Sequence, residues 1–108
     1  MEIKDYQNKA VETAIYGVGN CITYPALGLA NEAGEVLGKI KKVLRDKDGV
    51  FDEEACTAIG DEIGDTLWYM AALARDLNLD LNKIAERNLT KLYDRKLRQV
   101  IGGSGDNR

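Results

Sequence analysis

Apolar residues along this chain recur every three or four positions, and no segment shows sustained alternation between apolar and polar residues. A period near 3.6 is typical of helices that bury one face, whereas half-buried strands show a period of two. We therefore predict an all-α fold with four main helices. Their expected bounds are 3–16, 25 to 44 or 45, 53–76, and 80 or 82 to about 100.

Turn-forming residues separate the predicted helices. Asp46-Lys47-Asp48-Gly49 has turn chemistry, and Asp52 suits the N-cap of the third helix. At 108 residues the chain is the size of one domain, which we divide into a helical domain over 1–101 and a glycine-rich tail over 102–108. Polar tails of this composition are usually frayed ends.

Composition excludes several classes of function. The net charge of −3 gives no reason to expect nucleic acid or an anionic membrane as a partner. The chain has no run of about 18 apolar residues and no signal-peptide pattern at its start, so we expect a cytoplasmic protein. Histidine is absent, which removes Ser-His-Asp and Cys-His catalysis, His-ligated zinc and the Glu-x-x-His motif of di-iron bundles. Any catalysis must therefore use carboxylates, lysines, tyrosines and metal.

Two acidic pairs stand out in the second and third predicted helices. Glu32 precedes Glu35 by three residues, and Glu62 precedes Asp65 by the same interval. This spacing places both carboxylates of a pair on one side of a helix. If the two helices pack face to face, four carboxylates converge and repel one another. Such a cluster usually needs a counter-charge, and a divalent metal ion is the usual one.

The position of each pair relative to the apolar face supports this arrangement. On a helical wheel, Glu32, Glu35 and Lys39 fall on one shoulder of the apolar arc of the second helix. Glu62, Asp65 and Tyr69 occupy the same kind of shoulder on the third helix. Helices that pack through their apolar arcs can line one cleft with such shoulders. The members of the two arcs are Leu29, Ala33, Val36, Leu37, Ile40, Val43 and Leu44, and Ile59, Ile63, Leu67, Met70, Ala71 and Ala74.

A simpler interpretation of these residues stays open at this point. Acidic residues are common on helix flanks, and Glu35 has the i, i+4 spacing for an ion pair with Lys39. Such a pair stabilises a helix by about 0.2–0.5 kcal/mol without any functional role. The occurrence of two pairs, each followed after four residues by a polar side chain on the same shoulder, favours the metal site.

The combined pattern resembles the MazG-like nucleoside triphosphate pyrophosphohydrolases of the all-α NTP pyrophosphatase superfamily. Residues 29–35 (Leu-Ala-Asn-Glu-Ala-Gly-Glu) resemble the first metal motif of that family, and residues 61–69 (Asp-Glu-Ile-Gly-Asp-Thr-Leu-Trp-Tyr) resemble the second. Asn88 and Lys91, followed by Arg95, resemble its Asn-x-x-Lys element. The resemblance covers about residues 6–96, and the tail is similar to the ending of some small phage-type members.

The resemblance implies a four-helix bundle assembled as a dimer or a dimer of dimers, and hydrolysis of an NTP or dNTP to the monophosphate and pyrophosphate. Mg²⁺ is the implied cofactor, with Mn²⁺ as a substitute, and a phage-encoded member would act in the host cytoplasm. Glu35 is our choice of general base, with Lys39 as a second catalytic residue. The matched metal ligands are Glu32, Glu35, Glu62 and Asp65, and the expected substrate contacts are Tyr69, Asn88, Lys91, Arg95 and, from a tail closing as a lid, Arg108.

A second function remains open beside the hydrolase. A relative that kept only the fold would be a non-catalytic helical module for nucleotide binding or protein interaction. The sequence feature that separates the two is the intact set of four carboxylates, because a purely structural relative has no chemical reason to retain them.

Overall fold

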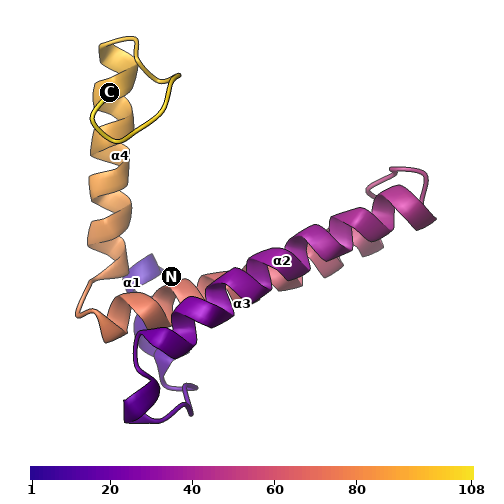
Figure 1. The fold of residues 1–108 in the computed structure, drawn as a ribbon, viewed down its shortest axis with the longest axis horizontal. Helices are drawn as coiled ribbons and strands as arrows, with labels where there is room; N and C mark the ends of the chain where they lie inside the picture. The colour runs from indigo at the N-terminus through magenta and orange to yellow at the C-terminus, as the bar shows by residue number, and fades with distance from the viewer.

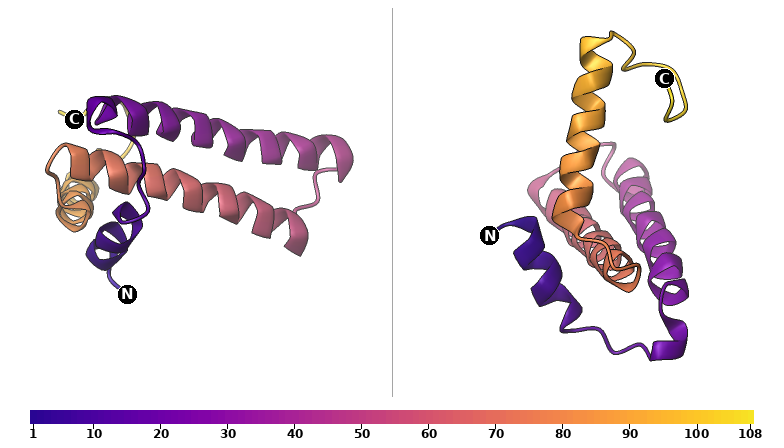
Figure 2. Two further views of the ribbon diagram at one scale, coloured as in Figure 1. Left: turned by 90° about the horizontal axis from the view of Figure 1, so that it is seen from below. Right: turned by 90° about the vertical axis from the view of Figure 1, so that its left-hand side faces the viewer.

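The computed structural model describes residues 1–108 and confirms the all-α fold. It contains four α-helices, α1 (Ile3–Val11), α2 (Thr23–Asp46), α3 (Glu53–Asp76) and α4 (Leu81–Leu97), and a short 3-10 turn, η1 (Val18–Asn20). The long helices α2 and α3 lie side by side as a hairpin, and α1 packs against α3 (Figures 1 and 2). The last helix, α4, leaves the end of α3 at a steep angle and stands away from the hairpin (Figure 1).

Local chemistry fixes the hairpin connection and the start of α3 where the sequence predicts them. Asp48 and Gly49 take left-handed φ angles of 52° and 75°, and the Gly49 N–H donates to the Val43 carbonyl at 3.1 Å. The Asp52 side chain then accepts a hydrogen bond from the Ala55 N–H at 2.8 Å, which caps α3. The predicted bounds 53–76 match the helix in the structure.

The first helix is shorter than predicted, because tertiary contacts replace its last turn. It ends at Val11 instead of Tyr16, although the apolar periodicity continues to Ile15, whose side chain is 98% exposed. The Ala10 carbonyl accepts hydrogen bonds from Thr13 Oγ1 at 2.7 Å and from the indole N–H of Trp68 at 3.1 Å. These donors satisfy a helix end that would otherwise need a further turn.

The segment between α1 and α2 is fastened to the end of α3 by one buried carboxylate. Asp76 Oδ2 accepts hydrogen bonds from the Tyr16 hydroxyl and from the Ile22 N–H, both at 2.9 Å. Arg75 donates to Asp76 Oδ1 at 3.2 Å and to the Tyr16 hydroxyl at 2.9 Å. Ile22 adopts a φ of 69°, which is strained for a β-branched residue. Asp76 therefore holds a bend that determines where α2 begins.

The core is small and lies where α1, α3 and α4 meet. Ala71, Ala74 and Leu81 are buried together there. Buried Gln7 joins the three helices: its amide donates to the carbonyls of Ala71 and Leu79, and its side-chain oxygen accepts from the Leu81 N–H. No helix has the length and apolar character that a membrane crossing requires.

The predicted apolar arcs are only partly covered within one chain. Leu37 and Leu44 of α2 are 68% and 63% exposed, and Ile63 of α3 is 55% exposed. The radius of gyration is 16.8 Å, whereas a compact domain of this length has about 13 Å. The single chain is therefore open, with apolar surface left on its long hairpin.

Candidate active site

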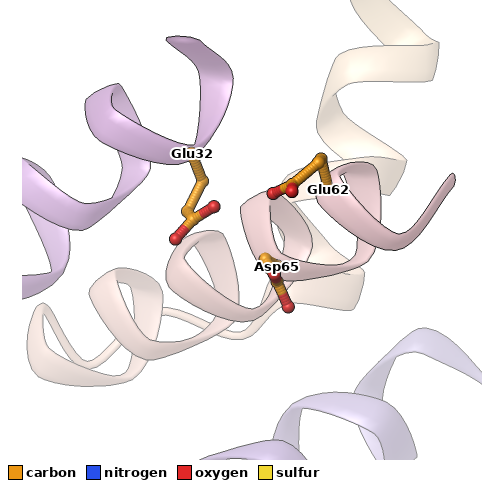
Figure 3. A group of neighbouring side chains, drawn as sticks. All are labelled: Glu32, Glu62 and Asp65. Carbon is orange, nitrogen blue, oxygen red and sulfur yellow. The ribbon is translucent and has the colours of Figure 1, made fainter. Parts of the chain in front are cut away.

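Three of the four predicted metal ligands converge between the helices of the hairpin. Glu32 comes from α2, and Glu62 and Asp65 come from α3 (Figure 3). Each offers a carboxylate oxygen, and these oxygens all lie within 4.8 Å of one another. The i, i+3 spacing puts Glu62 and Asp65 one turn apart on α3, and the packing of α2 brings Glu32 against them. The predicted convergence of the two motifs is thus observed for these three side chains.

Like charges dominate the electrostatics of this group. Burial raises the pKa of Glu32, and a hydrogen bond with Glu62 and the negative charges of Asp65, Glu62 and Glu35 raise it further. The nearest cation is Lys39, whose Nζ lies 3.9 Å from Glu62 Oε1. Lys39 therefore joins α2 to α3, and it does not form the i, i+4 pair with Glu35 that the sequence allowed.

Glu35 lies beside this group but outside the set of converging oxygens. Its side chain is exposed and makes no ion pair in the structure. Its charge nevertheless contributes to the raised pKa of Glu32, so it faces the same region. The roles of Glu35 as metal ligand and general base remain predictions.

The donor set fits a hard divalent cation. All three converging groups are carboxylates, and neither histidine nor cysteine lies among them. Oxygen ligands of this kind suit Mg²⁺ or Mn²⁺, whereas zinc sites use nitrogen or sulfur donors more often. A bound cation would also relieve the repulsion among these carboxylates, which adds to the effect of burial on the pKa of Glu32.

A cavity opens directly beside the carboxylates and has an aromatic wall. It has a volume of about 380 Å³ and is lined by Glu32, Asp65, Trp68 and Tyr69. Trp68 and Tyr69 also line a neighbouring cavity of about 320 Å³. The other lining residues of that second cavity are Thr13, Ile15, Tyr16, Asn20 and Tyr24.

The aromatic rings form a connected group. Tyr16 stacks on Tyr24 with 5.0 Å between ring centroids, and Tyr24 lies 6.3 Å from Tyr69. Trp68 meets Tyr69 edge to face at 5.0 Å, and its indole N–H also donates to Thr13 Oγ1 at 2.8 Å. Burial raises the pKa of Tyr69, and Tyr24, Glu32 and Asp65 raise it further, so its phenol stays protonated at neutral pH.

The sequence indicated Tyr69 but not the tyrosines of the neighbouring cavity, Tyr16 and Tyr24. Tyr16 and Tyr24 lie in or near the connection between α1 and α2, where periodicity carries no information. Gly28 was missed as well: a Cβ at this position would overlap the Tyr69 ring. The only available signal was the gathering of two tyrosines in residues 16–24, which indicates no particular contact.

The predicted substrate contacts on α4 are not joined to the carboxylates within one chain. Lys91 and Arg95 both pair with Asp106 of the tail, and no ion pair links them to the acidic group. Asn88 is exposed on the same helix. Arg108 donates to the carbonyls of Gly105 and Ile101, so its guanidinium is turned toward the tail itself.

Comparison with known proteins identifies the family. The model of the MazG nucleotide pyrophosphohydrolase domain matches residues 24–99, which is most of the chain and includes both acidic pairs. The chain belongs to the MazG family. A protein of Mycobacterium phage L5, the Gene 37 protein, is 48% identical over 114 aligned positions, which cover the whole of both chains. No solved structure gives a significant match.

Proposed function

We propose that this MazG protein is a metal-dependent pyrophosphohydrolase that converts an NTP or dNTP to its monophosphate and pyrophosphate, in nucleotide-pool control or sanitation. The observation that carries the proposal is the convergence of Glu32, Glu62 and Asp65 within 4.8 Å beside an aromatic cavity. The family match supports the same class of activity.

The carboxylates would hold the metal, and neighbouring residues would move protons and charge. Glu32, Glu62 and Asp65, joined by Glu35, are the proposed ligands of Mg²⁺ or Mn²⁺. When bound, the ion would neutralise phosphate oxygens and lower the pKa of a coordinated water. Glu35 is exposed and free of ion pairs, so its carboxylate can accept a proton from an attacking water. Lys39, held near Glu62, can offset negative charge on the phosphates.

The aromatic cavity is the proposed place of the nucleobase. It adjoins the proposed metal site, because Glu32 and Asp65 line it together with Tyr69. Aromatic side chains offer stacking and edge-on contacts to the flat faces of a nucleobase. The neighbouring hydroxyls of Thr13 and Tyr24 can add hydrogen bonds to the base edge.

The test is product analysis with matched variants. The protein would be incubated with each NTP and dNTP and Mg²⁺ or Mn²⁺, and pyrophosphate would be resolved from orthophosphate. We expect monophosphate and pyrophosphate from at least one nucleotide, and a loss of about 100-fold or more in kcat for Asp65→Asn, because the variant removes a charged ligand from the cluster.

Asp61→Asn is the matched control. Asp61 lies one turn before Asp65 on α3, is exposed and stands outside the converging group. This variant makes the same charge change and should keep near-normal kcat. Equal losses in both variants would remove Asp65 from the site. No turnover of any nucleotide, together with metal-dependent nucleotide binding, would favour the non-catalytic module.

A further inference from the structure

The tail, residues 102–108, folds back onto α4 and places a carboxylate on the basic residues of that helix. Asp106 Oδ1 lies 3.1 Å from Lys91 Nζ and 3.2 Å from Arg95 Nη2. The Asp106 carbonyl accepts a further hydrogen bond from Arg95 Nη2 at 3.0 Å. Arg98 holds the main-chain oxygen of Arg108 at 2.7 Å. Polar contacts to α4 thus fasten both Asp106 and the tail's last residue.

Arg95 and Asp106 differ sharply in burial. Arg95 is only 4% exposed, and a buried guanidinium needs an anion close to it. The side chain of Asp106, which supplies that anion, is 81% exposed. The preceding residues 102–105 are exposed glycines and a serine with no apolar group to anchor them. The partner of the buried cation is therefore a group that water and other anions can reach.

A polar cavity lies between α4 and the tail at this point. Its volume is about 710 Å³, and cationic, amide and hydroxyl side chains dominate its lining. Arg87 and Lys91 supply positive charge, and amide groups come from α4 and from the tail. So many hydrogen-bond donors close together suit a chain of phosphate oxygens better than an apolar ligand. The donors in the lining are Arg87, Asn88, Thr90, Lys91 and Asn107. Ile84 and two carboxylates, Asp94 and Asp106, line it as well, and Asp94 is paired with Arg98 at 2.9 Å.

We infer that Asp106 acts as an internal competitor: its carboxylate occupies Lys91 and Arg95, the phosphate contacts that the family resemblance implies, and the phosphate chain of the substrate displaces it. The identity of the ligand as substrate rests on the proposed function. This role is opposite to that of a lid: the tail presents a carboxylate to the basic residues, while Arg108 donates to the carbonyls of Gly105 and Ile101.

The tail has the freedom that displacement requires. Gly103 and Gly105 adopt φ angles of 89° and 84°, which bend the chain so that Asp106 reaches α4. Glycine takes such angles without strain and equally well adopts others, so the tail can close or open with little change elsewhere. While the tail is closed, the apparent affinity for an outside anion falls in proportion to the fraction of protein whose site is open.

The test is calorimetric titration of the full chain with inorganic tripolyphosphate in buffer containing EDTA. Asp106→Asn removes the competing charge, so we expect tripolyphosphate to bind about three- to ten-fold more tightly than to the wild type. Glu86→Gln makes the same charge change on α4 outside the cavity and should leave the affinity nearly unchanged. In a Lys91→Gln background, Asp106→Asn should give no comparable gain.

Three results would overturn the inference: unchanged affinity in Asp106→Asn, weaker affinity, which a lid would give, or an equal gain in Glu86→Gln.

Nucleotide turnover is measured separately, so a failure of the competitor role can be distinguished from a failure of the proposed hydrolase. If the wild type turns over a nucleotide but Asp106→Asn does not bind tripolyphosphate more tightly, only the competitor role of Asp106 is rejected. If Asp106→Asn binds tripolyphosphate more tightly but no nucleotide is turned over, the polyphosphate site is retained and the proposed hydrolase is rejected.

Discussion

At the scale of single residues, Gly28 decides where the Tyr69 ring stands. A Cβ at position 28 would overlap that ring, so Gly28→Ala must push Tyr69 out of the cavity it lines. We expect the KM for a nucleotide substrate to rise by roughly two- to ten-fold, since an aromatic contact of this kind is worth about 0.5–1.5 kcal/mol. The fluorescence of Trp68, the only tryptophan, should change as well, because its ring meets Tyr69 at 5.0 Å.

Gly34→Ala is the control for this prediction. Gly34 lies on the same helix, and nothing stands within 4 Å of a Cβ built there. Alanine should therefore keep KM and the Trp68 emission unchanged and stabilise the helix by about 0.5–1 kcal/mol. If both variants changed KM and emission equally, the contact between Gly28 and Tyr69 would have no part in binding.

Ionised Glu32 lowers the stability of the metal-free protein, although the proposed metal site requires its charge. Its pKa is raised by burial, by its hydrogen bond with Glu62 and by the surrounding negative charges, so its ionised form destabilises the metal-free protein. We expect Glu32→Gln to raise the Tm measured in EDTA and to abolish the further rise in Tm that Mg²⁺ gives the wild type. A Tm gain from Mg²⁺ equal to that of the wild type would exclude Glu32 as a ligand.

The sequence identified the acidic group but not its full surroundings. Spacing and shoulder position, which follow from helix geometry, predicted that four carboxylates converge. Glu32, Glu62 and Asp65 do so, whereas Glu35 lies outside the group. The pairing of Lys39 with Glu62 depends on how α2 is rotated against α3, which periodicity does not specify. Contacts of Tyr16 with Tyr24 depend on an irregular segment, and no repeating pattern describes such a segment.

At the scale of elements, Asp76 fixes the connection between α1 and α2. Its side chain is 3% exposed and accepts hydrogen bonds from Tyr16, Ile22 and Arg75. Asp76→Asn removes the negative charge to which these three groups donate. We therefore expect the free energy of unfolding, measured by urea titration at pH 7, to fall by about 1–3 kcal/mol. Because the connection carries Tyr16 to the neighbouring cavity, where Tyr16 lines the wall together with Trp68 and Tyr69, KM should rise in the same variant.

The effect of Asp76 should depend on pH with a defined sign. Burial acts to raise the pKa of Asp76, but the hydrogen bonds from Ile22, Tyr16 and Arg75 outweigh it, so the pKa in the folded protein is lowered. The stabilisation is then fully present above the unfolded-state pKa of about 3.9 and is lost as the pH falls through the folded-state value. The difference between wild type and Asp76→Asn should shrink accordingly in acid.

Asp94→Asn provides the comparison for this pH dependence. Asp94 forms an i, i+4 pair with Arg98 on α4, and its side chain is 58% exposed. Exposed pairs contribute about 0.2–1 kcal/mol, so this variant should have a much smaller effect at pH 7. A pH-independent difference between wild type and Asp76→Asn would show that the lost stability is due to packing and not to the ionised carboxylate.

Helix boundaries show which elements the sequence could predict. The bounds of α3 were predicted correctly because Asp52 caps its start and the chain beyond Asp76 turns at Asn78, which has a φ of 58°. The end of α1 was predicted wrongly because Trp68, 58 residues away, supplies the donor that ends it. Boundaries set by local caps can be predicted, whereas those set by distant side chains cannot.

At the scale of the whole molecule, the open shape bears on where the complete site is formed. Figure 1 shows α4 leaving the α2–α3 hairpin at a steep angle, so the helix that carries Lys91 and Arg95 stands apart from the hairpin that carries the carboxylates. Apolar side chains of the hairpin, such as Leu37 and Leu44, remain largely exposed. A second copy that covers this surface could bring its α4 toward the carboxylates of the first.

This arrangement predicts that two inactive variants restore each other. Asp65→Asn and Lys91→Gln would be co-expressed with different affinity tags, and the mixed dimer would be purified through both. If each site combines the hairpin of one chain with α4 of its partner, one site of a mixed dimer carries both substitutions and the other carries neither. The mixed dimer should then show about half the pyrophosphate release of the wild type, although each variant alone is nearly inactive. If Lys91 served the carboxylates of its own chain, every site would carry one substitution, and the mixed dimer would stay as inactive as its parents.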